Sequence, residues 1–140
     1  MEFIELVKNR FSCKNFSDKK VEDEKLDLIL QAGRFAPTAK NKQIQRIYVC
    51  KSEKALLKVD DLTPCRYKAP LVLLVAYDES EAFVYPGGKY NSGAEDASIV
   101  ASHMIWLQQA LEWILVGLIF LILIRQVRNF LCLKMKKSLL

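Results

Sequence analysis

Apolar positions near the start of the chain recur at helical spacing. In Glu2–Asn9 they fall on one side of a short helix. A longer helix is predicted over about Val21–Arg34, with Asp18 as a candidate cap and acidic residues in its first turn. Pro37 prevents this helix from continuing. One stripe of the longer helix is apolar or small: Leu26, Ile29, Leu30 and Gly33.

The middle of the chain changes to strand patterns. Arg46–Cys50 is rich in β-branched and aromatic residues and predicts a strand, and Glu53–Val59 predicts a short helix. The uninterrupted apolar run Leu71–Tyr77 is typical of a strand that is buried on both faces. Asp78–Ser92 is expected to be a loop, and a helix from about Ala94 follows, capped by Ser92 or by a residue beside it.

Composition divides the chain in two. The 140 residues, 51% hydrophobic and 26% charged, suit one globular domain. Residues 1–112 carry 16 basic and 16 acidic side chains, whereas residues 113–140 carry five basic ones and no acid, so the whole net charge of +5 lies in the tail. We therefore treat 1–112 and 113–140 as separate units, and we expect no nucleic-acid partner because the first unit is charge-neutral.

The four cysteines indicate a reducing compartment. They are widely spaced, without a C-x-x-C pair, which favours neither a disulfide framework nor a metal site. Glu2 and Glu5 interrupt the N-terminal stretch where a signal peptide needs a basic start and an apolar run. We therefore expect a cytoplasmic protein.

Two stretches could bind a ligand. Arg10, Ser12 and Lys14 alternate, so an extended segment would point them the same way to grip a phosphate, although a solvated polar loop has the same composition. Gly33–Gln43 (GRFAPTAKNKQ) combines small and amide side chains that a flat ligand could approach, although an ordinary loop ended by proline would look alike.

Together these stretches resemble a known family. Arg10–Lys14 is similar to the R-x-S-x-[RK] phosphate element of the nitroreductase family of FMN-dependent oxidoreductases, and Gly33–Gln43 resembles the A-P-[ST]-x-x-N-x-Q-P element. Gly93–Ile99 resembles the start of that family's long dimer-forming helix. Ile44 stands where the family usually has proline, so we expect a looser turn after Gln43.

The resemblance, which covers about residues 2–105, implies a fold and a function. The implied fold is α+β, with a mostly antiparallel sheet flanked by helices, in a homodimer with FMN in two interface sites. The implied reaction is ping-pong hydride transfer from NAD(P)H through the flavin to a nitro compound, quinone or similar small acceptor, without a catalytic side chain or metal. The implied FMN contacts are Arg10, Phe11, Ser12 and Lys14 from one subunit and Pro37, Thr38 and Ala39 from the other, with Asn41 supporting the loop.

Two other features are poorer candidates for chemistry. His103, the single histidine, lies in an apolar helical run and is expected to be a hydrogen-bonded core or interface residue. Gly87 and Gly88 lack the following Lys-Ser/Thr of a phosphate-binding loop and are expected to form a turn.

The tail after Trp113 does not match the family. Its apolar run WILVGLIFLILI is shorter than the ~20 residues that span a bilayer, so we do not expect a membrane anchor. Leu and Ile would permit a helix there. Reading permitted codons two nucleotides later gives Asp-Ser-Cys-Trp-Ile-Asp-Phe-Phe-Asp-Pro-Asp-Lys and then Val-Pro-Glu-Asn-Glu-Glu, which resemble the missing family segment. The hypothesis is a single-nucleotide frameshift near Trp106.

Three functions therefore stay open. The first is an FMN-dependent oxidoreductase of the nitroreductase type, present here as a truncated or frameshifted copy. The second is an inactive remnant or interaction domain, and the third is a membrane-associated protein. A flavin absorbance band separates the first from the others, and solubility without detergent separates the third.

Overall fold

The computed structural model describes residues 2–17, 19–112 and 118–122. Within residues 2–112, its α-helices and strands lie where the sequence predicts them, with shifted ends. The second helix starts at Asp23 rather than Val21, and the third continues to Leu62 rather than ending at Val59. The predicted cap Asp18 lies outside the described residues, and Glu22 occupies the N-cap position of that helix. The elements in chain order are α1 (Phe3–Asn9), α2 (Asp23–Arg34), η1 (Ala39–Asn41), β1 (Gln45–Cys50), α3 (Glu53–Leu62), η2 (Pro64–Arg66), β2 (Leu71–Tyr77), α4 (Gly93–Ala110) and β3 (Leu118–Ile122).

The three strands form one sheet in the order β1, β2, β3. β1 pairs antiparallel with β2, from Gln45 opposite Tyr77 to Cys50 opposite Val72. β3 pairs parallel with β2 on the other side, from Leu71 opposite Leu118 to Val75 opposite Ile122. The α+β class is confirmed, and this part of the sheet holds one antiparallel and one parallel pair.

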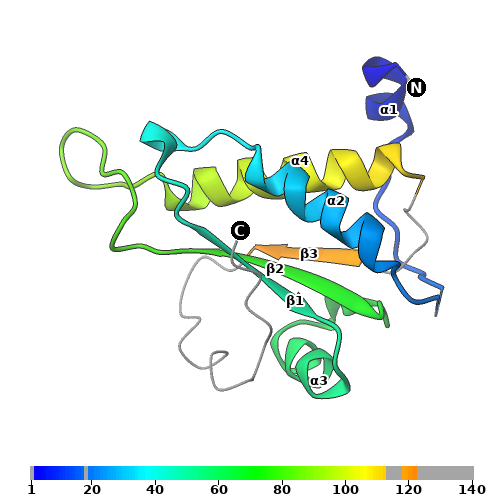
Figure 1. Cartoon of the computed structure of the whole chain (residues 1–140). Coiled ribbons are helices and arrows are strands. Elements are labelled where there is room, and N and C mark those ends of the chain that lie inside the picture. Colours follow the sequence, from blue (N-terminus) through cyan, green and yellow to red (C-terminus); the bar gives the residue numbers. More distant parts are fainter. Residues whose placement is uncertain (1, 18, 113–117, 123–140) are drawn as a thin grey trace.

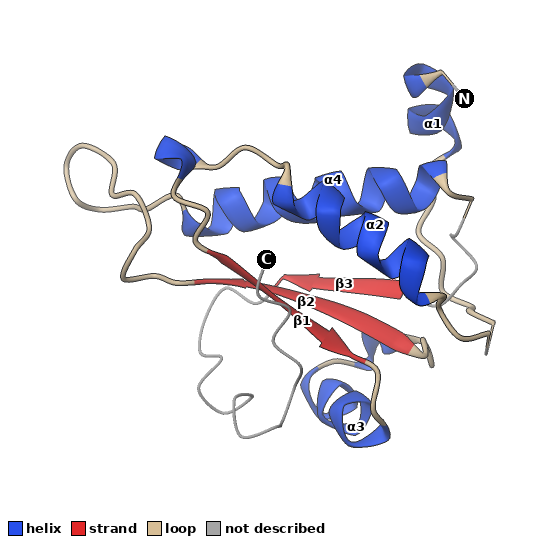
Figure 2. Cartoon of the chain, viewed as in Figure 1, coloured by secondary structure: helices blue, strands red, loops and turns tan. Residues whose placement is uncertain are grey.

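Helices cover both faces of the sheet (Figure 2). α2 and α4 lie over one face, and α3 lies against the other. Alternate residues of β2 enter the two cores, as strand geometry requires, which confirms the predicted burial on both faces. Leu71, Leu73 and Val75 face α2 and α4, whereas Val72, Leu74 and Ala76 belong to the α3 side.

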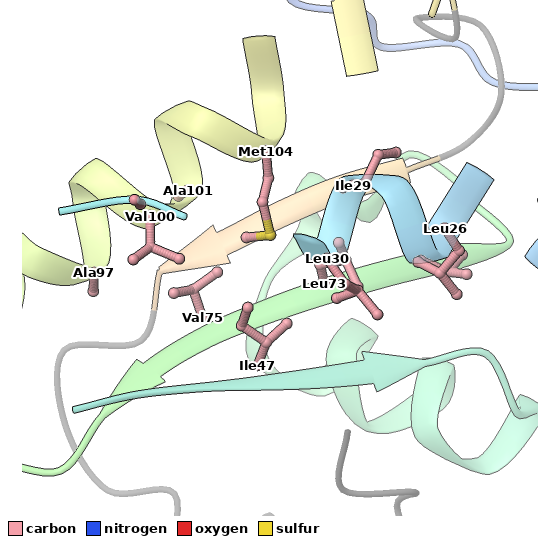
Figure 3. Packing of buried hydrophobic residues seen from close by; sticks show 12 residues of the cluster. Leu26, Ile29, Leu30, Ile47, Leu73, Val75, Ala97, Val100, Ala101 and Met104 are labelled. Carbon is pink, nitrogen blue, oxygen red and sulfur yellow. The ribbon is translucent and has the colours of Figure 1, made fainter. Parts of the chain in front are cut away.

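The larger core lies between the sheet and the α2–α4 layer (Figure 3). The predicted stripe of α2 is buried in full, from Leu26 to Gly33. Gly33 lets the two helices approach closely, because a Cβ built there would lie 2.9 Å from Sδ of Met104 in α4. The α2 stripe, Ile47 of β1 and the inner side of α4 therefore pack as one apolar cluster.

α1 lies at the C-terminal half of α4 (Figure 1). The rings of Phe3 and Trp106 meet edge to face with centroids 5.8 Å apart, and Nε2 of Gln109 donates to the Asn9 carbonyl at 3.5 Å. Leu6 is buried, but Phe3 and Ile4 are 65% and 59% exposed. Only part of the apolar side predicted for α1 is therefore covered within one chain.

The apolar tail differs from expectation where it is described. Residues 118–122 form strand β3 rather than a helix, paired along its length with the central strand. Strand formation suits this segment, because its Ile and Phe residues favour a pleated backbone. Among the described residues, no helix could cross a bilayer.

Candidate functional site

The two predicted ligand-binding stretches lie at opposite ends of α4 (Figure 1). The Ala39 amide contacts Asp96 in the first turn of α4, whereas Asn9, next to Arg10, contacts Gln109 in the last turn. Thirteen residues separate these contacts along the helix, which is about 20 Å at 1.5 Å per residue. The structure therefore does not bring the two stretches together within one chain.

The first stretch is an exposed loop after α1. Arg10, Phe11, Ser12 and Lys14 are all exposed, with Phe11 at 52%. In the described part of the chain, the side chains of Arg10 and Ser12 make no hydrogen bond or ion pair within the protein. Their donors are thus free to meet an anion from solvent.

The turn around η2 lies close to Lys14. The pKa of the exposed Cys65 thiol is lowered, chiefly by hydrogen bonding to Thr63 and then to Tyr67, and the positive charge of Lys14 adds to the effect. The Tyr67 hydroxyl donates the hydrogen bond to the Cys65 sulfur, which raises the pKa of Tyr67. The electrostatic interaction between Lys14 and Cys65 links the candidate phosphate loop to the segment that joins α3 to β2, which the sequence did not indicate.

The second stretch is a tight loop with an unusual backbone. Lys40, Asn41 and Gln43 have φ of 55°, 52° and 50°. The left-handed region costs a non-glycine residue roughly 1 kcal/mol or more, least for Asn. Such a conformation persists only when surrounding contacts fix it.

Hydrogen bonds to Thr38 and from Ala39 fix this loop. The Asn41 amide donates to the Thr38 carbonyl at 2.9 Å, and the Gln43 amide donates to Oγ1 of Thr38 at 3.0 Å. The Ala39 amide donates to Oδ1 of Asp96 at 2.8 Å. Pro37 is exposed, and Thr38 and Ala39 are half-buried. These small side chains therefore form a nearly flat patch of surface that solvent can reach.

The expected loosening at Ile44 is wrong. Ile44 is fully buried, and its carbonyl accepts from the Asp78 amide at 3.0 Å. An apolar side chain in the core and a main-chain bond to the end of β2 thus hold the chain after Gln43 in place without proline.

The loop between β2 and α4 borders this second stretch. Lys40 Nζ lies 5.7 Å from the ring centre of Phe83, and Lys42 Nζ donates to the Glu81 carbonyl at 3.0 Å. The Tyr85 hydroxyl donates to the Glu95 carboxylate, which raises the pKa of Tyr85. Gly87 and Gly88 have φ of 96° and 70° and make the expected turn.

The start of α4 is capped by Asn91, one of the residues beside Ser92 that were expected to cap it. The Gly93 amide is bound by Oδ1 of Asn91 at 3.0 Å, whereas the Ser92 hydroxyl donates to Oδ2 of Asp96 at 2.7 Å. Asp96 was part of the family-like Gly93–Ile99 segment, but its contact with Ala39 was missed. An acidic residue four positions after a serine at a helix start was the only local signal.

His103 lies on an open surface in this chain. Its Nδ1 is 3.0 Å from the Ile99 carbonyl, which confirms the expected hydrogen bond, but its side chain is exposed rather than in the core. It lines a shallow groove between α1 and α4. The groove is formed by Phe3, Ser98, Ile99, Ser102, His103 and Trp106.

Comparison with known proteins supports the family resemblance. Residues 7–65, which include both candidate stretches, match the model of the nitroreductase family. A nitroreductase family protein from Clostridium difficile 630 is 38% identical, with a TM-score of 0.76 over 79% of this chain and 64% of its own. An FMN-dependent nitroreductase from Clostridium difficile R20291 is 28% identical, with a TM-score of 0.66 over 77% of this chain and 61% of its own.

A curated relative matches a shorter segment. It is a Methanothermobacter thermautotrophicus protein with the provisional name NADH dehydrogenase/NAD(P)H nitroreductase, 28% identical over 83 residues, which are 57% of this chain and 44% of that protein. This chain thus spans less than two thirds of the length of each of these relatives. Residues 7–65 thus match the nitroreductase family, and over the part that it shares with them the chain is similar to members of that family in sequence and in fold.

Proposed function

We propose that this protein is an FMN-dependent oxidoreductase that takes electrons from NAD(P)H and passes them to a nitro compound, a quinone or a similar small acceptor. The observation that carries the proposal is the family match over residues 7–65, which includes both candidate FMN-binding stretches. FMN, when bound, supplies two-electron transfer between nicotinamide and acceptor, and the protein supplies binding and orientation.

The chemistry of the first stretch fits the FMN phosphate. Arg10 and Lys14 would provide two cationic donors and Ser12 a neutral one, a suitable set for a dianion. Because the side chains of Arg10 and Lys14 are exposed, phosphate binding would not require breaking an internal ion pair of the described residues. Phe11, half-exposed between them, would cover part of the cofactor and exclude water.

The second stretch fits the flat ring of the cofactor. Pro37, Thr38 and Ala39 would lie along its face, and Asn41 supports their loop through its bond to the Thr38 carbonyl. Oγ1 of Thr38 accepts from the Gln43 amide, so its own O–H remains able to donate to a ligand. The Ala39 amide is already bound to Asp96 and is not available.

A homodimer would unite the two stretches. They are about 20 Å apart along α4 in one chain, too far to hold one phosphate and its ring, so a complete site would combine Arg10–Lys14 of one copy with Pro37–Asn41 of another. The exposed apolar residues beside the α1–α4 groove, Phe3, Ile4 and Ile99, support a second copy as the partner.

We also propose that the tail is read out of frame from near Trp106. The shifted reading yields two family-like segments in the correct order. The pairing of β3 with β2 is made by main-chain groups, which many apolar sequences can supply, so it agrees with either reading. Sequencing the gene tests this: an intact frame without a family-like alternative reading would contradict it.

Reconstitution tests the proposed function. The full chain, purified without detergent and incubated with FMN, should retain a flavin absorbance band after gel filtration and elute as a dimer. NAD(P)H should bleach that band under anaerobic conditions. A folded chain that retains no flavin would show an inactive remnant instead, and a chain that requires detergent would favour membrane association.

A further inference from the structure

One buried carboxylate joins the loop of the second stretch to the rest of the fold. Asp96 is 3% exposed. Its Oδ1 accepts from the Ala39 amide at 2.8 Å, and its Oδ2 accepts from the Ser92 hydroxyl at 2.7 Å. We propose that Asp96 is a positioning residue that holds the Pro37–Gln43 loop in the conformation that receives the flavin ring. This inference rests on the function proposed above.

The loop needs an external anchor because of its backbone. Three of its four residues from Lys40 to Gln43 have positive φ, and its other fixing bonds begin and end within residues 38–43. Such internal bonds define the shape of the loop, and its buried neighbours Ala36 and Ile44 fix only the two ends. The other bonds from the loop to the neighbouring segment run through the flexible, exposed side chains of Lys40 and Lys42.

Asp96 is itself rigidly placed. Its amide donates to the Ser92 carbonyl at 2.8 Å, and the Ser92 amide donates to the Phe83 carbonyl at 2.8 Å. Gly93 lies against the ring of Tyr77, the last residue of β2, so closely that an added Cβ would clash with the ring. The first turn of α4 is thus fixed against the sheet. The hydrogen bond between Asp96 and the Ala39 amide therefore fixes the position of Ala39 as well.

The charge of Asp96 is well accommodated at this place. It lies in the first turn of α4, where the helix dipole favours an anion. Each of its two oxygens also receives a hydrogen bond, which compensates for its burial. The carboxylate therefore has no free oxygen that requires another partner, and its function is structural rather than chemical.

Three variants separate positioning from general stability. Asp96→Leu has a similar volume and removes both acceptors. Asp96→Asn keeps an oxygen for the Ala39 amide and an NH2 that can donate to Oγ of Ser92, so it should rescue the contact. Val100→Ala is the matched control, because it removes buried methyl groups one turn further along α4 without touching the loop.

The readouts are hydrogen exchange of the peptide that covers residues 37–43, measured without FMN, and FMN affinity by fluorescence titration. For Asp96→Leu we expect exchange at the Ala39 amide to rise at least tenfold and FMN to bind about tenfold more weakly, in keeping with the loss of the hydrogen bond that holds the loop. Asp96→Asn should stay close to the wild type in both. Val100→Ala should lower the melting temperature without raising loop exchange selectively.

The outcomes are distinguishable from those of the proposed function. Wild-type exchange in the loop of Asp96→Leu would overturn the positioning role, as would an Asp96→Asn variant as loose as Asp96→Leu. If Asp96→Leu does not fold, Asp96→Ser, whose hydroxyl is too short to reach the Ala39 amide, replaces it with the same expectations. A loosened loop in a protein that never binds FMN would uphold the anchor but refute the flavin site.

Discussion

The two halves of the candidate site are built in opposite ways. The loop at the start of α4 has a fixed, strained backbone that a buried carboxylate ties to the sheet. The loop at the end of α4 consists of exposed side chains, and the donors of Arg10 and Ser12 have no partners among the described residues. The loop at the start of α4 therefore has its conformation before a ligand binds, whereas the loop at the end of α4 contributes positive charge and free donors.

This difference matches what each half would contact. A flat ring is held by shape, so a surface that is already formed avoids the entropic cost of ordering it on binding. A phosphate is held by charge-assisted hydrogen bonds that act from several directions, so flexible cations suffice. The comparison predicts that variants at the start of α4 change the order of the Pro37–Gln43 loop and the stability of the fold. Variants of Arg10 and Lys14 should change only the affinity for FMN.

The largest effect is expected from the charged half. Arg10→Ala combined with Lys14→Ala removes two charge-assisted contacts, each worth about 1.5–3 kcal/mol, so FMN affinity should fall at least a hundredfold. The melting temperature of the protein without FMN should hardly change, because both side chains are exposed. Fluorescence titration and a thermal melt measure the two effects.

A matched variant controls for net charge. Lys19→Ala with Lys20→Ala removes the same charge from exposed residues further along the same loop and should leave FMN affinity within about threefold. Equal affinity of the two double variants would refute the assignment of Arg10 and Lys14 to the phosphate.

Variants at the start of α4 should change the stability of the fold. Gly93→Ala places a methyl group against the Tyr77 ring, which packs against the larger core, so we expect a loss of about 1–3 kcal/mol in the free energy of unfolding. Gly33→Ala is the comparison variant, since its Cβ meets the flexible side chain of Met104 at 2.9 Å and should cost less. Unfolding in denaturant measures the stability of both variants. If Gly33→Ala is less stable than Gly93→Ala, the tight packing proposed for the start of α4 is contradicted.

The smallest effect concerns the surroundings of Lys14. Burial raises the pKa of Cys50 to about 11, whereas hydrogen bonds and the charge of Lys14 lower the pKa of exposed Cys65. At pH 8, iodoacetamide should therefore alkylate Cys65 much faster than Cys50, as peptide mapping by mass spectrometry can show. Lys14→Ala should slow the alkylation of Cys65 by a measurable factor of up to about threefold, because one screened charge is lost. An unchanged rate would show that Lys14 does not act on this turn.

Local patterns predicted much of the fold. The stripe of α2 and the apolar run of β2 each depend on spacing within one segment, and both are found where they were expected. The helix ends shifted because the stop of α3 and the start of α2 depend on weak terminal signals. β3 was not foreseen, because an apolar run that pairs with a distant strand has the same composition as a buried helix.

The site was only partly predictable for a similar reason. The cations of Arg10–Lys14 and the small residues of Pro37–Ala39 are visible as short motifs. The contact between Asp96 and Ala39 joins residues 57 positions apart, and the positive φ of Lys40 follows from that closure rather than from its side chain. Long-range hydrogen bonds leave little trace in a single sequence.

Subunit mixing tests most directly whether the two halves meet across copies of the chain. Chains with Arg10→Ala and Lys14→Ala are mixed one to one with Asp96→Leu chains, dissociated and reassembled, and FMN binding is titrated. If each site takes one half from each copy, every mixed dimer contains one intact site, so about one quarter of all sites should regain wild-type affinity. If each site is built within one chain, mixing would leave the affinity at the level of the two separate variants and contradict the account.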